Sequence, residues 1–190
     1  RGSERDVNYG MGMYIVGREK LLELVEGCMS RNEYDLDRDL MRAVHELKVM
    51  GFEFTGTAYQ ITSFEAYFEA NMALMEPKIR AELFNSNRPI YTKVRDDMPA
   101  KYGLNSSVSN SLIADGCVID GEVENCVLFR GVKIGKGAKV KNCVLMQDTV
   151  VEAGAKLEYI ITDKNVTISA DKDIKGTDTF PVYVAKYQTV

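Results

Sequence analysis

Three aspartates at alternating positions, Asp35, Asp37 and Asp39, are the first residues whose types and spacing could do chemistry. Carboxylate oxygens are hard ligands, so a D-x-D-x-D run can bind a divalent cation. The run lacks the glycine and the twelfth-position glutamate of an EF-hand loop, which excludes that family. Carboxylates at the start of a helix are also ordinary caps that complement the helix dipole. The cap is the favoured interpretation, and no metal ligand is assigned.

His45 is the single histidine of the chain and stands beside Val44, Glu46 and Leu47 on a predicted helix. A histidine base needs a nucleophile or a substrate proton within hydrogen-bond reach. No serine or cysteine forms a recognisable motif with His45. The sequence therefore assigns no catalytic residue.

Four lysines, Lys133, Lys136, Lys139 and Lys141, form a local basic strip. The glycines between them do not open a helix after a strand, as a phosphate-binding loop would. Most such strips are solvated corners, which is the favoured interpretation. An anionic metabolite effector is the alternative that stays open.

A repeated motif runs through the second half of the chain. Val108 to Ile113 matches Val123 to Leu128, then Val140 to Leu145, and more weakly Leu157 to Thr162. The successive steps are 15, 17 and 17 residues, and the short step is assigned to a trimmed corner at Asp120-Gly121. Within each unit the apolar residues recur about every six positions, which is typical of hexapeptide β-helices.

The elements implied by this repeat are short strands that stack into a left-handed β-helix with inward apolar residues. We expect about three and a half coils, and the alternative is a set of antiparallel strands joined by glycine turns. Cys126 and Cys143 occupy equivalent positions and should stack as buried thiols on adjacent coils. No CxxC or zinc spacing is present among the four cysteines, and reduced thiols in a cytoplasmic protein are expected.

Composition and charge exclude several classes of function. The net charge is −4, with no basic face interleaved with aromatics, so a nucleic-acid partner is not expected. No apolar run reaches membrane-spanning length, and the charged start does not read as a signal peptide. At 190 residues and 45% hydrophobic, the chain can bury a core and form one or two domains.

The first hundred residues predict helices at 19–30, 37–50, 63–75 and 77–83, and β-prone runs at 11–16 and 52–59. So few strands cannot form an α/β core on their own. We therefore expect residues 1–84 to be the C-terminal part of a larger α/β domain, with a small α+β cap as the alternative. An extended linker at 85–103 would lead to the β-helix at 104–190, whose last residues could cap it.

Several local sequences resemble the ADP-glucose pyrophosphorylase family, also called glucose-1-phosphate adenylyltransferase. Residues 11–16 (MGMYIV) resemble that family's MGIYVF strand, and residues 35–39 (DLDRD) stand where it has DFGKD. Residues 63–71 (SFEAYFEAN) resemble its TLEAYWKAN helix, and residues 88–92 (RPIYT) its WPIRT linker. The NS-x-V-S start of its coils is matched at residues 105–109. The resemblance implies a nucleotidyltransferase-type α/β domain followed by a β-helix.

Departures from the family pattern concern the substrate site. The resemblance implies that Asp35, Leu36, Asp39 and Gln60 stand at substrate-binding positions. Gln60 replaces the aspartate that helps to hold Mg²⁺ in the family's WRDVGT segment, and a neutral amide is a poor substitute there. The family's glycine-rich nucleotide loop is not in this sequence.

These departures imply a regulatory or assembly subunit without cofactor, which works with a Mg²⁺-dependent catalytic subunit of the same family or as a homo-oligomer through the β-helix. A competent sugar-phosphate nucleotidyltransferase is one alternative. A hexapeptide acyltransferase is another, although the coils lack the histidine that such enzymes usually carry.

Overall fold

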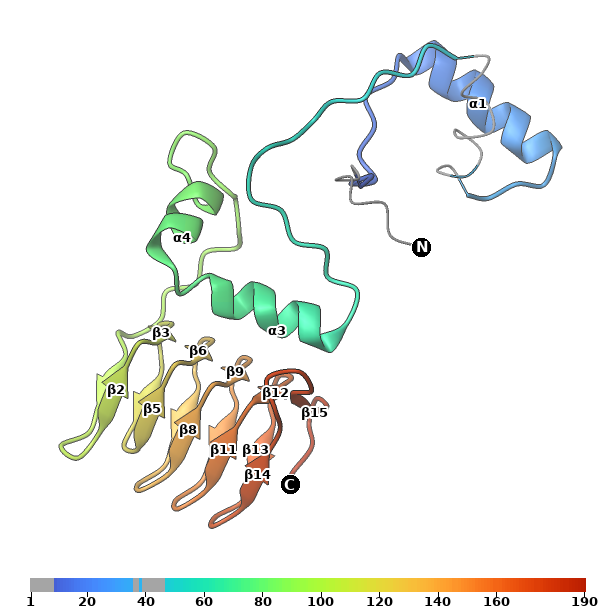
Figure 1. Ribbon diagram of the computed structural model, residues 1–190. Coiled ribbons are helices and arrows are strands. Elements are labelled where there is room, and N and C mark those ends of the chain that lie inside the picture. The colour runs from blue at the N-terminus through green and yellow to red at the C-terminus, as the bar shows by residue number, and fades with distance from the viewer. Residues whose placement is uncertain (1–8, 36–37, 39–46) are drawn as a thin grey trace, which may run out of the picture. The chain divides into compact units, whose positions relative to one another are not determined.

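The computed structural model describes residues 9–35, 38 and 47–190 of the chain (Figure 1). These residues belong to two compact units, Arg1–Thr55 and Gly56–Val190. The helices of the described residues do not reach the length and apolar character needed to cross a membrane. The domain limits predicted at residues 84 and 103 stay predictions.

The first unit contains helix α1, Arg18–Ser30, which confirms the helix predicted at 19–30. None of its residues is buried, and its apolar side chains Leu22, Val25 and Met29 are exposed. The predicted second helix, like His45, falls almost wholly on residues outside the described ones, and its described end, 47–50, is not helical.

The strands predicted at 11–16 and 52–59 are wrong, because both segments have irregular backbone. A strand is stabilised by hydrogen bonds to neighbouring strands, and β-propensity alone cannot hold one. The described part of the first unit offers no such neighbour. Among the described residues up to position 84, the predicted α/β domain is therefore represented by helices and not by strands.

Two further helices, α3 (Phe64–Ala73) and α4 (Pro77–Leu83), begin the second unit and match the predicted ranges. Ser63 is the N-cap of α3, as predicted, and its hydroxyl accepts a hydrogen bond from the Ala66 backbone N–H at 3.1 Å. Pro77 stands at the first turn of α4, where its missing N–H costs nothing.

The rest of the second unit is a β-helix of three parallel five-stranded sheets, which confirms the repeat-based prediction. Sheet A contains β1 (Lys101–Tyr102), β4 (Val118–Ile119), β7 (Lys133–Ile134), β10 (Val150–Val151) and β13 (Thr167–Ile168). Sheet B contains β2 (Ser107–Ser109), β5 (Glu122–Glu124), β8 (Lys139–Lys141), β11 (Lys156–Glu158) and β14 (Asp173–Lys175). Sheet C contains β3 (Leu112–Ile113), β6 (Val127–Leu128), β9 (Val144–Leu145), β12 (Ile160–Thr162) and β15 (Val182–Val184).

Each coil contributes one strand to each sheet, so the β-helix has five coils, and the expected three and a half is wrong. The first coil begins at Lys101, ahead of the repeated motif. The last coil interrupts the motif with an insertion before β15, so Ile160 pairs with Val182 at a step longer than 17 residues. The tail expected to cap the coils, 169–190, contributes β14 and β15 to the fifth coil, and its last residues lie along β13, where Thr189 forms a bridge with Thr167.

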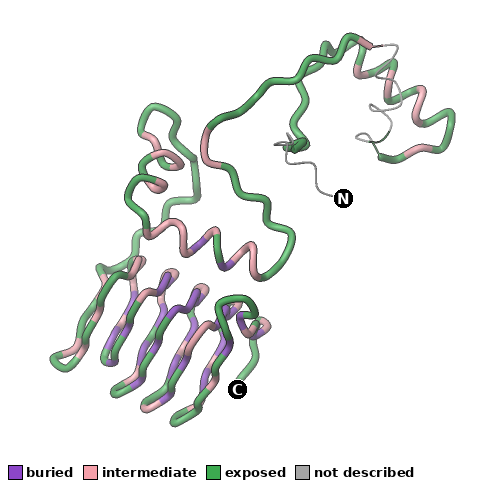
Figure 2. Tube along the Cα trace, in the orientation of Figure 1, coloured by how far each residue is buried: buried purple, intermediate pink, exposed green. Residues whose placement is uncertain are grey.

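The interior is filled by the apolar residues that the hexapeptide period places inward, such as Ile119, Leu128, Ile134 and Leu145, which are nearly fully buried. Figure 2 shows that buried positions recur along the successive coils. The short corner is at Asp120-Gly121, as predicted. A Cβ on Gly121 would lie 2.4 Å from the Ala138 carbonyl oxygen, so this corner requires glycine.

Stacked corners between sheets B and C carry a column of asparagines in the left-handed backbone conformation: Asn110, Asn125 and Asn142. The Asn110 side-chain amide donates to the Asn125 carbonyl oxygen at 2.8 Å, and Asn125 donates to Asn142 at 2.5 Å. Asparagine tolerates positive φ better than most residues and can satisfy its neighbour in the stack. In the fourth coil Tyr159 takes this position.

Cys126 and Cys143 stack on adjacent coils as buried free thiols, in agreement with the prediction. The Cys143 backbone N–H donates to the Cys126 sulfur at 3.3 Å. Burial, with the neighbouring Cys126, raises the pKa of the Cys143 thiol well above its ordinary value.

Candidate functional site

The residues that the family resemblance places at the substrate site are only partly described. Leu36 and Asp39 lie outside the described residues. Asp35 is exposed in the first unit, and its carboxylate accepts a hydrogen bond from the Arg38 backbone N–H at 3.1 Å, the kind of bond that a helix cap makes. Gln60 is exposed in the second unit. The substrate role of all four stays a prediction.

The residues that are described do not fit a Mg²⁺ site. No group of three or more His, Cys, Asp and Glu side chains among them could hold a metal ion. Gln60 offers a neutral amide, whereas Mg²⁺ in phosphate chemistry is usually held by carboxylates together with the substrate phosphates. No metal-dependent step is therefore assigned to these residues.

In the second unit, Gln60 lies between two residues, Thr57 and Ser63, whose hydrogen bonds anchor the segment. On one side, the Thr57 backbone N–H and hydroxyl each donate to a different oxygen of the Glu82 carboxylate on α4, both at 2.6 Å. These hydrogen bonds lower the pKa of Glu82. On the other side, Ser63 caps α3. The segment that carries Gln60 is thus attached to both helices.

Helix α3 packs on the outer face of sheet C, as Figure 1 shows. Phe68 is buried there against Val127, Val144 and Ile161, one from each of three successive coils. At the start of the helix, the Phe64 ring stacks on Tyr183 of the fifth coil with centroids 4.4 Å apart. The Tyr183 hydroxyl donates to the Asp163 carboxylate at 3.2 Å. Helix α3 therefore ties the Gln60 segment to the coils.

An apolar hollow of about 220 Å³ lies in the same unit, between α3, α4 and the segment that follows them. Its polar side chains are those of Tyr59 and Asn71, and the Asn71 amide donates to the Tyr67 backbone carbonyl at 2.8 Å. The hollow is lined by Tyr59, Ala70, Asn71, Leu74, Leu83, Phe84 and Ile90. With no titratable acid, base or nucleophile apart from the Tyr59 phenol, it suits contact with an apolar group rather than catalysis.

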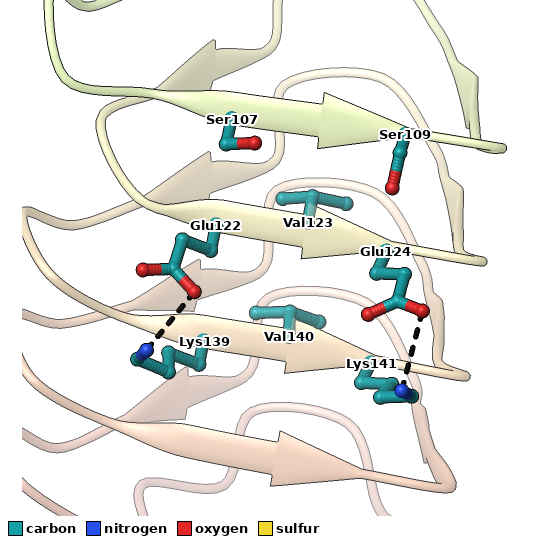
Figure 3. Close-up of a pocket in the computed structure, with 8 residues that line it drawn as sticks. All are labelled: Ser107, Ser109, Glu122, Val123, Glu124, Lys139, Val140 and Lys141. Atoms are coloured by element: carbon teal, nitrogen blue, oxygen red, sulfur yellow. Dashed lines mark ion pairs between the residues drawn. The ribbon is translucent and has the colours of Figure 1, made fainter.

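The outer face of sheet B carries a shallow hollow of about 190 Å³ lined by charged side chains of the second and third coils (Figure 3). Lys139 pairs with Glu122 at 3.0 Å, and Lys141 pairs with Glu124 at 3.2 Å. Half of the predicted lysine strip is therefore compensated by carboxylates. Lys133 and Lys136 form no ion pair with a described residue.

Comparisons with known proteins agree with this architecture. A family model described as GlmU-like, C-terminal hexapeptide matches residues 97–180, which supports the left-handed β-helix. The glycogen biosynthesis protein GlgD of Bacillus subtilis (strain 168) is 44% identical over 174 residues, or 92% of this chain and 51% of that protein. The chain is a homologue of GlgD.

Two further relatives extend this relationship. GlgD of Geobacillus stearothermophilus is 41% identical over 129 residues, or 67% of this chain and 37% of that protein. The glucose-1-phosphate adenylyltransferase of Clostridium beijerinckii (strain ATCC 51743 / NCIMB 8052) is 33% identical over 135 residues, or 68% of this chain and 35% of that protein. The chain spans about half the length of the first of these relatives and about a third of the other two.

Sequence reasoning on this GlgD homologue missed two features of the surface. One is the contact of Phe68 with the outer face of sheet C. The sequence indicates this contact by outward apolar residues at 17-residue steps, Val127, Val144 and Ile161. The other is the pairing of the lysines. Glu122 and Glu124 each precede a lysine by 17 residues, which is one coil.

Proposed function

We propose that the chain is the C-terminal portion of a regulatory or assembly subunit of glucose-1-phosphate adenylyltransferase in glycogen biosynthesis. The complete complex would make ADP-glucose and pyrophosphate from ATP and glucose 1-phosphate in the cytoplasm. The observation that carries this proposal is the 44% identity to GlgD over 92% of the chain, against 33% over 68% for a glucose-1-phosphate adenylyltransferase.

The chemistry of Gln60 supports a subunit without its own activity. Nucleotidyl transfer requires a metal ion that neutralises phosphate charge as the nucleophile attacks. By resemblance, Gln60 stands at a metal-binding aspartate, and an amide supplies no compensating charge. Mg²⁺ and the chemical step are therefore assigned to the catalytic partner.

The α3 contact supports a role in transmitting contacts made by the coils. Phe68 and Phe64 attach α3 to four of the five coils, and the Gln60 segment enters this helix directly. A partner that binds the β-helix would thus bind a unit to which the segment that carries Gln60 is attached through α3. In this proposal the β-helix makes the subunit contacts.

An anionic metabolite effector is part of the same proposal. Lys133 and Lys136 are the members of the lysine strip that form no ion pair with a described residue. A phosphorylated metabolite could bind them as a pair of point charges. Lys139 and Lys141 are less suitable, because Glu122 and Glu124 would repel an anion.

Coexpression tests the function directly. The full-length parent is assayed for ADP-glucose formation alone, with its catalytic partner, and beside the partner alone. We expect no activity from the parent alone and a higher rate or altered effector response in the mixture. Robust activity of the parent alone would overturn the proposal in favour of a competent nucleotidyltransferase. A His45→Ala variant should behave like the parent, and loss of an acyl-transfer activity in it would favour the acyltransferase alternative.

A further inference from the structure

The outer face of sheet B carries one row of two side chains per coil, and the second and third rows each carry a single sign of charge. Each of its strands turns two side chains outward, on either side of a more buried central residue. From the first coil to the fifth the rows are Ser107 and Ser109, Glu122 and Glu124, Lys139 and Lys141, Lys156 and Glu158, and Asp173 and Lys175. Figure 3 shows the glutamate row directly beside the lysine row.

These two rows keep bonding capacity beyond their pairs within the chain. The Glu122–Lys139 and Glu124–Lys141 pairs are 3.0 and 3.2 Å long, and every one of the four side chains is at least half exposed. Exposed pairs of this kind add little to the stability of a fold. A carboxylate can accept several hydrogen bonds and an ammonium can donate three, so each group can also contact a second molecule.

We propose that the glutamate and lysine rows of sheet B form a self-complementary contact with a second copy of this chain. The two-fold axis would run parallel to the strands, between the second and third coils. It would place the glutamate row of each copy opposite the lysine row of the other and create four Glu–Lys contacts. This inference deepens the proposed function, because it rests on the chain being an assembly subunit.

The other face-to-face arrangement of two copies is disfavoured by charge. A two-fold axis along the stack of coils would set Glu122 opposite Glu124, and Lys139 opposite Lys141. Like charges placed opposite each other repel, and such contacts exclude wrong arrangements. About the proposed axis, the fourth row faces the serine row, so no like charges meet there.

A smaller block of opposite charges is present on the fourth and fifth coils, where Glu158 pairs with Lys175. An axis between these two coils would also match Lys156 with Asp173 and Glu158 with Lys175. Only two coils of each copy would then overlap, against four about the proposed axis. This block serves as the internal control of the experiment.

The experiment uses two charge variants of the whole chain, Glu122→Lys/Glu124→Lys and Lys139→Glu/Lys141→Glu. In sedimentation velocity at low ionic strength, we expect the unmodified chain to form a dimer that dissociates as salt is added. Each variant alone should bind itself at least about tenfold more weakly, because rows of like charge then face each other. An equimolar mixture of the two variants should form a heterodimer.

The mixture separates the proposal from a role of these pairs within one chain. Both variants lose their internal pairs, and mixing cannot restore those. The fourfold variant Glu122→Lys/Glu124→Lys/Lys139→Glu/Lys141→Glu should again dimerise with itself. The matched control Glu158→Lys/Asp173→Lys makes the same change in net charge on the same face and should leave the dimer unchanged.

A monomeric unmodified chain, or variants that do not combine when mixed, would overturn the proposal. So would loss of the dimer in the Glu158→Lys/Asp173→Lys control, because the contact would then depend on the charges of the fourth and fifth coils instead of the glutamate and lysine rows. Activation of a catalytic partner is measured separately as ADP-glucose formation. A failed sedimentation test therefore overturns the sheet B contact without overturning the proposed function. A failed activity test overturns the proposed function without overturning the contact.

Discussion

Apolar side chains are mostly buried in the coils, whereas in the described part of the first unit they are largely exposed. In the coils, Leu145, Ile160 and Val166 are completely buried, and each coil supplies the surface that covers the next. In the first unit, α1 has no buried residue, and Ile15 and Met13 are largely exposed. In a repeat, the neighbouring coil covers the apolar side chains of each coil. The apolar face of a single helix must be covered by another element.

Truncation of a core leucine should show this contrast most strongly. Leu145→Ala removes a fully buried side chain, and we expect a loss of about 2–5 kcal/mol in the free energy of unfolding of the coils. Leu22→Ala on α1 is the matched control, and it should change stability by less than about 0.5 kcal/mol. Urea unfolding followed by far-UV circular dichroism measures both, since the chain has no tryptophan. Equal losses would contradict the contrast.

Helix α3 should behave as an extension of the coils rather than as a free helix. Phe68→Ala should cost about 1.5–3 kcal/mol of docking energy, because Phe68 is buried on sheet C. Amide hydrogen exchange should then speed up at least about tenfold in α3 and remain slow in β6, β9 and β12. Phe180→Ala, at an exposed phenylalanine of the same unit, is the control and should alter neither. Unchanged protection of α3 in Phe68→Ala would show that other contacts hold it.

The repeat could be predicted from sequence because its signal is periodic and local to each coil. Val123, Val140 and Leu157 recur at a fixed step, and β-helices need that step to keep their inward residues aligned. The count of coils failed where the periodicity changes. Lys101 precedes the motif, and the insertion between Ile174 and Val182 hides the fifth coil.

Features that depend on a partner could not be predicted in the same way. The run 11–16 has the composition of a strand, yet no neighbouring strand is present among the described residues, and its backbone is irregular. The fourth, weaker copy of the motif ends in Thr162, which places a polar side chain at a buried position. In the structure its hydroxyl lies 3.0 Å from that of Thr149, which satisfies both. The role of Gln60 rests on resemblance, since periodicity carries no information about a substrate site.

The cysteines give the smallest and most selective test of the contrast, because Cys28 lies in the first unit and Cys117, Cys126 and Cys143 in the coils. Cys28 is half-buried and the other three are fully buried. The thiolate is the reactive form, and burial raises the pKa of both Cys117 and Cys143. An alkylating reagent at pH 8 should therefore modify Cys28 first in the native chain and reach the other three only after unfolding. Mass spectrometry of the labelled peptides would show this order.

The same raised pKa makes the stability of the coils depend on pH at the alkaline end. In the unfolded chain Cys143 loses its proton near pH 9, whereas in the folded chain it keeps the proton to higher pH. The stability that the protonated thiol contributes is complete below about pH 9 and is lost as pH rises further toward the folded pKa.

Between pH 8 and 10 the free energy of unfolding should fall by about 1 kcal/mol less in Cys143→Ala than in the unmodified chain. Tyr67 and Tyr183 also have raised pKa values and titrate in the same direction in both proteins, so the difference between the two slopes isolates Cys143. If the free energy of unfolding fell equally with pH in both proteins, the Cys143 thiol would be accessible to water. The coils would then not differ from the first unit in the burial of their cysteines.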